Sequence, residues 1–272
     1  MNAANPPALS VVVPTKNEEA NIGACLAAFA PFRGEVELVV VDNSSPDRTR
    51  EIAAAAGARV MVQGPERCAQ RNRGWRESHG EFVMFVDADM VVPPETVREL
   101  LACLRSDGAP DAFYIPEVRV GRGLRIKARN FERSFYDGTC IDGLRVIRRG
   151  LLEKVGGYDE SLVACEDWDL DRRLVAAGAR TSTTKGALHH NEARQTLRVF
   201  LRKKAYYSTS VAAYRSKWSD DWICRRQFGL GYRFFGVFVE NGKWRRLLRH
   251  PILAAVMYFE RIAVGAVYLI CR

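Results

Sequence analysis

The sequence lacks the cysteine patterns of a disulfide scaffold or a structural zinc site. Its seven cysteines are odd in number, and no two of them have C-x-x-C spacing. This usage favours a reducing cytoplasm. Residues 1–9 contain no basic stretch followed by an apolar run, so no secretory signal is expected. No internal repeat and no low-complexity linker is present, and 21 glycines, 11 prolines and 10% aromatic residues exclude a disordered or fibrous chain.

Acidic residues are scarce in the last part of the chain. The 272 residues contain 41 Lys and Arg against 32 Asp and Glu, a net charge of +9. From Arg194 onward, 16 basic and 4 acidic residues give +12, so the first 193 residues carry 25 minus 28, or −3. The shift predicts an acidic body over residues 1–193 and a basic extension over residues 194–272. A uniformly basic nucleic-acid binder is not expected.

One apolar run, from Pro251 to Cys271, is long enough to cross a bilayer, but Glu260 and Arg261 stand in its middle. Each charge at mid-membrane costs about 2.5–3.5 kcal/mol on insertion scales. A spanning helix is therefore disfavoured, and a helix at a membrane surface or packed on a partner is expected.

The basic extension combines aromatic and basic residues, with helical spacing over 194–217 and the run K-W-R-R-L-L-R at 243–249. An anionic membrane surface attracts this composition. The alternative is a solvated basic face on a helix that packs against the body. If the extension binds a membrane, the protein would lie at its inner, cytoplasmic face.

Short β-rich runs alternate with helical stretches over the first 115 residues. The runs lack strict apolar–polar alternation, which indicates a mostly parallel sheet covered by helices on both faces, an α/β fold. The expected strands are Leu9–Pro14, Val36–Val41, Arg59–Val62, Phe82–Val86, 112–115 and 143–147, and the expected helices are Glu19–Phe29, Asp47–Ala56, Cys68–Ser78, Pro94–Leu104 and 166–177.

Three of the expected strands end in polar residues, namely Thr15 to Glu18, Asp42 to Ser45 and Asp87 to Asp89. Ligands of such sheets bind beyond the carboxyl ends of the strands. The first two clusters are also good N-caps for the helices that follow, and as isolated motifs they decide nothing.

Asp87 and Asp89 follow a buried strand, with Ala88 between them. Two carboxylates at this spacing can approach one divalent cation, and hard oxygen ligands suit Mg²⁺ or Mn²⁺, which also bridge substrate phosphates. The pair alone is a weak signal, because an Asx turn at the start of a loop has the same residues. Its position after a strand favours the functional interpretation.

A second acidic group, E-D-W-D-L-D-R-R at 166–173, places four acids in six residues. Ordinary capping of a helix explains one or two of them. A carboxylate in such a cluster could serve as the general base toward a hydroxyl.

Six sequence blocks stand in an order that resembles the family 2 glycosyltransferases with a GT-A fold. They are S-V-V-V-P-T-K-N-E-E-A-N-I, V-V-V-D-N-S-S-P-D-R-T, A-Q-R-N-R-G-W, F-V-D-A-D, G-G-Y-D-E and C-E-D-W-D-L-D-R-R-L. The resemblance covers Leu9 to about Asn191 and implies a Rossmann-like catalytic domain. It also implies an inverting transfer of a sugar from a nucleoside diphosphate sugar, with Mn²⁺ or Mg²⁺ as cofactor.

The resemblance also implies roles for individual residues. Asp167 would be the catalytic base, and Glu166 beside it would orient the acceptor. Asp89 would ligate the metal, with Asp87 at the ribose or metal. The residues expected to bind the nucleotide-sugar are Pro14, Thr15, Asn17, Glu18, Asp42, Arg71, Asp87 and Ala88. The resemblance implies UDP as the donor nucleotide. Its base is less firmly assigned, because many relatives carry a stacking aromatic where Lys16 stands.

His189 and His190 lie about where some relatives place a third metal ligand, and we name His190 as the candidate. A structural role for this pair is the alternative.

The acceptor would be a growing glycan or a lipid-linked group. A nucleotidyltransferase is the alternative enzyme, but residues 10–25 contain only Gly23 where a glycine-rich phosphate loop would stand. A catalytically silent module recruited to a membrane is the alternative outside enzymes. The sequence leaves the sugar, the linkage and the oligomeric state open.

Overall fold

The computed structural model describes residues 6–191, 200–202, 207 and 210–270. Residues 267–270 are described by their backbone alone. The chain forms two compact units. The first comprises Met1–Glu117, Gly143–Glu160 and Asp169–His190, and the second comprises Val118–Asp142, Ser161–Trp168 and Asn191–Arg272. The charge shift at residue 193 thus marks most of the second unit, but two earlier segments belong to it as well. Part of the helix expected over 194–217 lies outside the described residues.

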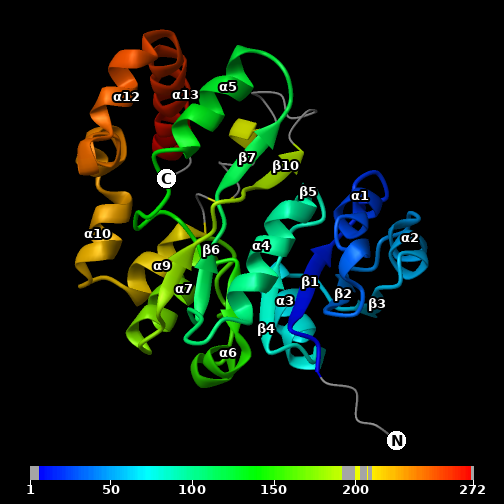
Figure 1. The fold of residues 1–272 in the computed structure, drawn as a ribbon. Coiled ribbons are helices and arrows are strands. Elements are labelled where there is room, and N and C mark those ends of the chain that lie inside the picture. Colours follow the sequence, from blue (N-terminus) through cyan, green and yellow to red (C-terminus); the bar gives the residue numbers. More distant parts are fainter. Residues whose placement is uncertain (1–5, 192–199, 203–206, 208–209, 271–272) are drawn as a thin grey trace, which may run out of the picture. The chain divides into compact units, whose positions relative to one another are not determined.

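The first unit contains the sheet (Figure 1). Its strands are β1 (Leu9–Thr15), β2 (Val36–Asp42), β3 (Arg59–Val62), β4 (Phe82–Phe85), β5 (Met90–Val91), β6 (Ala112–Tyr114), β8 (Val146–Arg148), β9 (Thr181–Thr183) and β10 (Leu188–Asn191). Its helices are α1 (Ile22–Ala27), η1 (Ala30–Phe32), α2 (Thr49–Ala55), α3 (Arg67–Glu77), α4 (Pro94–Leu104), α6 (Arg149–Val155) and most of α7 (Glu166–Ala176).

Seven strands form one sheet in the order β3-β2-β1-β4-β8-β6-β9. Strands β1 to β4 are parallel neighbours, β8 runs antiparallel to β4 and β6, and β6 is parallel to β9. The expected α/β fold with a mostly parallel sheet is therefore confirmed. The register sets Thr15 opposite Asp42, so the ends of β1 and β2 coincide.

The sheet is buried on both faces, which explains its unbroken apolar runs. Val11 and Val13 of β1 belong to one apolar cluster, with residues of α1, α2 and α4. Val12 belongs to another, with residues of α3, α6 and α7. Successive side chains of a strand point to opposite faces, so each helix layer covers one face of the sheet.

The second unit is helical. Its elements are β7 (Glu117–Val120, of which Glu117 belongs to the first unit), α5 (Leu124–Arg133), α9 (Val211–Lys217), α10 (Trp222–Phe228), the π-helix η2 (Tyr232–Gly236), α11 (Val237–Val239), η3 (Glu240–Gly242), α12 (Trp244–Arg249) and α13 (Pro251–Ile270). Its main core joins Phe131 and Phe135 to Phe238 and Met257. Among the residues described, none of the helices is both long enough and apolar enough to span a membrane.

Candidate functional site

The candidate site begins where the chain reverses direction across the sheet. From β1 the chain adds β2 and then β3 on one side, and it returns with β4 on the other side of β1. The loops that follow β1 and β4 therefore part from each other beyond the strand ends. This is the position at which open α/β sheets bind ligands. Thr15 ends β1 here, and the segment from Asp87 to Asp89 follows β4.

Backbone hydrogen bonds tie the loop after β1 to the loop after β2. The backbone N–H of Asn17 donates to Ser45 Oγ at 2.8 Å, and that of Glu18 donates to Thr49 Oγ1 at 2.9 Å. Ser45 in turn donates through both its N–H and its hydroxyl to Asp42, at 2.7 and 2.6 Å. Asp42 is fully buried and holds this arrangement. Its expected contact with a nucleotide stays a prediction.

Thr15 brings an unsatisfied hydroxyl to the same edge. Its side chain is buried at the end of β1, and Oγ1 has no hydrogen-bond partner among the residues that the structure describes. Buried polar atoms are normally paired, and an orphaned one at a strand end is consistent with a ligand, ion or water that binds there. Pro14 beside it is buried as well, whereas Asn17 is exposed.

Strained backbone is concentrated in the segments named from the sequence. Among the described residues, four that are not glycine have positive φ, and three of these are Asn17 (56°), Ser44 (50°) and Cys165 (63°). They lie in the loops after β1 and β2 and directly before α7. Such conformations cost of order 1–3 kcal/mol each and cluster at functional sites.

Helix α3 fixes the strand ends from beneath. Gln70 Nε2 donates to the carbonyls of Thr15 and Val41, at 3.0 and 2.6 Å. Arg71 is 1% exposed, and its Nη2 donates to Asp87 Oδ1 at 3.0 Å. Its guanidinium also lies 5.1 Å from the ring centre of Tyr158. Arg71 therefore positions Asp87 from inside the fold.

The edge carries concentrated negative charge. Burial raises the pKa of Glu18, and the charges of Asp89 and Asp87 raise it further. Burial together with these charges also raises the pKa of the Cys25 thiol to about 12. Burial opposes the charged form of Asp87, but the guanidinium groups of Arg71 and Arg67 outweigh it and hold the pKa of this carboxyl below its usual range. Asp87 thus stays ionised, and the negative charge at this edge favours a cation.

His190 lies between two carboxylates. The pairing of β10 with β5 sets it opposite Met90, the residue after Asp89. Its Nε2 lies 3.1 Å from Asp89 Oδ2, and its Nδ1 lies 2.9 Å from Glu117 Oε1. Burial alone would lower the pKa of His190, but the hydrogen bonds to Asp89 and Glu117 raise it to about 9. Glu117 also forms an ion pair with Arg145, whose Nη2 lies 3.6 Å from Oε2 of Glu117.

Asp89 and His190 fit a divalent cation that takes its other ligands from a substrate. A carboxylate oxygen and an imidazole nitrogen meet here, and a bound cation would displace the proton that Nε2 shares with Asp89. Within the described part of the chain, no three His, Cys, Asp or Glu side chains are placed to hold a metal by themselves. Cations of this class commonly use one or two protein groups together with substrate phosphates. Asp87, the other predicted ligand, is engaged by Arg71.

Helix α7 begins with the second acidic group, and two of its acids are structural. Asp169 is fully buried and accepts from Arg173 Nε at 2.8 Å, and Asp171 accepts from Tyr114 at 2.8 Å. Glu166 is buried and Asp167 is half-buried at the N-terminus of the helix. Both fall in the second unit, so their approach to Asp89 stays a prediction.

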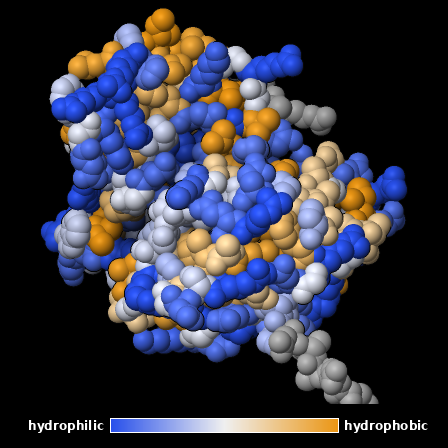
Figure 2. All heavy atoms as spheres, in the orientation of Figure 1, coloured by the Kyte–Doolittle hydropathy of each residue, from blue (hydrophilic) through white to orange (hydrophobic). Residues whose placement is uncertain are grey.

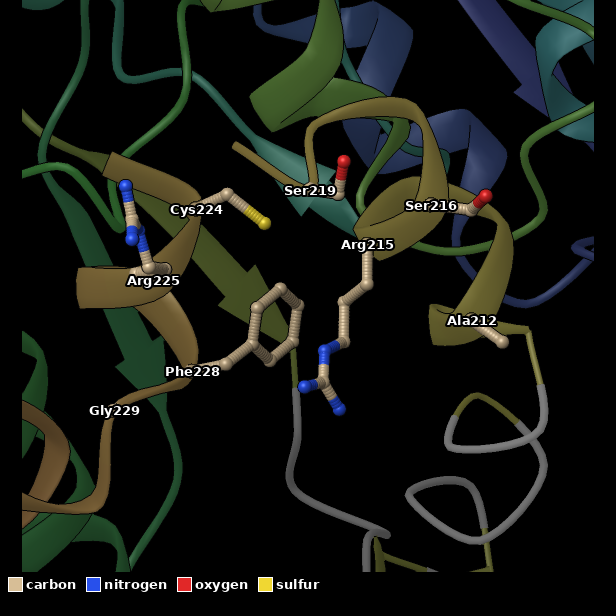
Figure 3. A pocket seen from close by; sticks show the side chains of 8 residues that line it. All are labelled: Ala212, Arg215, Ser216, Ser219, Cys224, Arg225, Phe228 and Gly229. Atoms are coloured by element: carbon tan, nitrogen blue, oxygen red, sulfur yellow. The ribbon is translucent and has the colours of Figure 1, made fainter. Parts of the chain in front are cut away.

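An open cavity of about 550 Å³ lies within the second unit, lined in part by Arg215, Arg225 and Phe228. Figure 3 shows Arg215 extended beside the ring of Phe228, while Arg225 points in another direction. The two guanidinium groups therefore do not converge on one position, as the binding of a diphosphate would require.

Sequence reasoning missed Glu117, Gln70 and Tyr158. Glu117 stands 73 positions before His190, and no local pattern marks it. Gln70 lies within the block A-Q-R-N-R-G-W that was singled out, but its bonds to two strand carbonyls depend on how α3 packs on the sheet. Only tertiary structure identifies such supporting residues.

Comparisons with known proteins found a family match and several relatives. Residues 10–156 match the family described as Glycosyl transferase family 2. The chain is 24% identical over 230 residues to the probable glycosyltransferase YdaM of Bacillus subtilis, a match that covers 74% of this chain and 54% of YdaM. The chain therefore spans about half the length of that relative.

Two solved structures share the fold. The mannosyltransferase PcManGT from Pyrobaculum calidifontis, in complex with GDP-Man and Mn²⁺, matches with a TM-score of 0.65 at 20% identity, over 98% of this chain and 86% of that one. TarS from Staphylococcus aureus, in complex with UDP-GlcNAc, matches with a TM-score of 0.55 at 20% identity, over 96% and 89%.

Proposed function

The chain belongs to glycosyl transferase family 2 and has the GT-A fold, and from this premise we propose that it moves a sugar from a nucleoside diphosphate sugar to an acceptor hydroxyl, with inversion. The observation that carries the proposal is the meeting of Asp89 and His190 beyond the ends of β1 and β4, where this sheet type binds ligands. The buried, unpartnered hydroxyl of Thr15 at the same edge supports a bound ligand there.

We assign the nucleotide to the loops after β1 and β2, and the diphosphate to the segment from Asp87 to Asp89. UDP is the nucleotide we propose for the donor. Solved structures with this fold hold UDP-GlcNAc in one case and GDP-Man in another, so the fold accepts both bases. Asp42 and Arg71 would act by holding the β2 loop and Asp87 in place.

Asp89 and His190 would hold Mn²⁺ or Mg²⁺ together with the donor's diphosphate oxygens. The bound cation would offset the negative charge that develops on the leaving diphosphate. Glu117 would keep His190 oriented through Nδ1. PcManGT was solved with Mn²⁺, which supports a metal of this class.

The chemical step we propose is a single displacement. The acceptor hydroxyl oxygen forms a bond to the anomeric carbon while the bond from that carbon to the diphosphate oxygen breaks. The hydroxyl proton passes to the carboxylate of Asp167, and Glu166 orients the acceptor. Because attack comes from the face opposite the diphosphate, the anomeric configuration inverts, and no covalent enzyme intermediate forms.

The acceptor we propose is a growing glycan or a lipid-linked group presented at the inner face of a membrane. The basic, aromatic-rich second unit supports this assignment, because anionic lipid attracts such surfaces. The chain would then work in the cytoplasm as a peripheral protein.

A thermal-shift screen tests the donor site. UDP-sugars and GDP-sugars are added with and without Mn²⁺, and ligands of the native state raise the apparent stability by mass action. A product assay with the best donor follows, using candidate glycan and lipid acceptors. Release of nucleoside diphosphate supports glycosyl transfer. Release of the sugar 1-phosphate indicates a nucleotidyltransferase, because nucleotidyl transfer breaks the bond between the two phosphates of the donor. Donor binding without turnover on any acceptor indicates a silent binding module.

Asp167→Asn tests the base. The change is nearly isosteric, so donor affinity should be retained while turnover falls by about 10²–10⁴-fold. Asp107→Asn, at an exposed aspartate of the first unit, is the matched control and should keep full turnover. Turnover of Asp167→Asn at the wild-type rate would show that another group removes the proton.

A further inference from the structure

Exposed apolar side chains are concentrated in the second unit. Among the described residues, fourteen large apolar side chains are exposed, and only Val62 and Val175 belong to the first unit. The other twelve lie in the second unit. Scattered single apolar residues are normal on a protein surface, and only a contiguous group of them marks a contact surface.

Helix α13 carries the most regular part of this surface. Ile252, Ala255, Phe259, Ile262 and Ala266 are all exposed, at intervals of three and four residues. This spacing places them in one stripe along the helix. Ile252, Phe259 and Ile262 are 68%, 65% and 63% exposed. Over Pro251–Ala266, where side chains are described, no charged or polar residue of α13 is exposed.

The two charges of α13 point the other way. Glu260 and Arg261 are 6% and 8% exposed, although the sequence places them in the middle of an apolar run. Glu260 pairs with Arg125 of α5 at 2.6 Å. Arg261 pairs with Glu132 of α5 and donates to the hydroxyl of Tyr136 at 2.7 Å. Helix α13 therefore buries its two charged side chains against α5 of the same unit, and its exposed side is apolar.

Helix α12 adds a basic and aromatic margin directly before α13. Trp244 and Leu248 are 43% and 71% exposed, and Arg245 and Arg249 are exposed between and after them. Neither α12 nor the outer side of α13 contributes an exposed acid. Figure 2 shows apolar side chains over α13 beside hydrophilic ones over α12.

We propose that the outer stripe of α13, with Trp244 and Leu248 of α12, inserts into the interfacial layer of an anionic membrane, with the axis of α13 parallel to the surface. This inference rests on the membrane contact of the proposed function and gives that contact its residues. The basic margin complements anionic headgroups, and the apolar stripe reaches the acyl boundary. A crossing helix is excluded, because Glu260 and Arg261 would enter the hydrocarbon.

Vesicle flotation with the full chain tests the proposal. Phosphatidylcholine vesicles with and without phosphatidylglycerol are compared, and the wild type should float with the anionic vesicles. Phe259→Glu combined with Ile262→Glu should reduce the bound fraction by about tenfold or more, since two apolar anchors are lost and two like charges are added to an anionic surface. Arg245→Glu combined with Arg249→Glu should weaken only the binding that depends on phosphatidylglycerol.

The matched control is Val62→Glu with Val175→Glu, which adds the same two charges at exposed apolar positions of the first unit. This control should float like the wild type. Thermal unfolding of all variants, monitored by circular dichroism, separates loss of binding from loss of fold. Phe259→Trp adds a depth measurement, because brominated acyl chains should quench its fluorescence on binding.

Three results would overturn the proposal, each with a different meaning. Equal flotation of the α13 variant and the wild type would leave the membrane contact standing but place it elsewhere. No flotation of the wild type on any vesicle would remove the membrane contact, while donor binding in the thermal-shift screen would leave glycosyl transfer intact. A wild-type dimer in sedimentation, dissociated by the α13 substitutions and without lipid binding, would assign the stripe to a second copy of the chain.

Discussion

Replacing Glu117 with alanine should weaken metal binding at a site that Glu117 does not touch. Its carboxylate accepts from His190 Nδ1 at 2.9 Å, and the opposite nitrogen of the ring faces Asp89 at 3.1 Å. Without Glu117 the imidazole loses the group that fixes its orientation and raises its basicity. We expect Mn²⁺ affinity to fall although both direct ligands remain.

The magnitude follows from the burial of the contact. Glu117 is 8% exposed, so its bond to His190 is a partly desolvated hydrogen bond with a charged acceptor. Such bonds contribute about 1.5–3 kcal/mol, which corresponds to roughly 10–150-fold in affinity. Mutations of outer-shell partners of metal-ligating histidines cost about 10–100-fold. Glu117→Gln should have a smaller effect, because its amide oxygen can still accept from Nδ1.

Electron paramagnetic resonance of free Mn²⁺ provides the assay, because the signal of the aqueous ion disappears on binding. Titration of the metal alone gives the dissociation constant without reference to turnover. Glu153→Ala, at an exposed glutamate of the same unit, is the control and should match the wild type. An unchanged dissociation constant in a folded Glu117→Ala protein would refute the positioning role.

Two further predictions concern buried ion pairs. Arg71→Met should lower the free energy of unfolding by about 2–3 kcal/mol, because Asp87 loses its partner but is itself 24% exposed. Urea denaturation measures this loss, and Arg73→Met, on the exposed side of α3, is the control. In the second unit burial opposes the charge of Glu132, but Arg261 outweighs it and lowers the pKa below the ordinary 4.5. The stability lost in Glu132→Gln should therefore be largest above pH 4.5 and shrink as the pH falls through the folded-state pKa, and a difference independent of pH would contradict this.

The parallel strands were predictable because their apolar runs encode burial on both faces. Leu9–Thr15 and Val36–Asp42 were expected to within one residue, and Pro94–Leu104 was expected with its observed bounds. The helix expected from Glu19 begins instead at Ile22. The backbone N–H groups of Glu18 and Glu19 donate to side chains some thirty positions away, and no local propensity reports such bonds.

The candidate site was predictable in part for the same reason. Motifs located Asp87, Asp89 and His190 separately, because each stands at or near a strand end. The sequence could not show that Asp87 is held by Arg71 while Asp89 meets His190. That division depends on the pairing of β10 with β5, across about 100 residues of chain.

The two buried charges of α13 also fix the register in which this helix packs against α5. Consecutive residues of opposite sign, Glu260 and Arg261, meet partners of opposite sign, Arg125 and Glu132, that stand two turns apart on α5. An exchange of partners would bring two carboxylates together and two guanidinium groups together. Buried ion pairs add little net stability, yet they penalise every alternative docking. Apolar contacts alone would let α13 slide or rotate on α5. The two ion pairs confine it to one register.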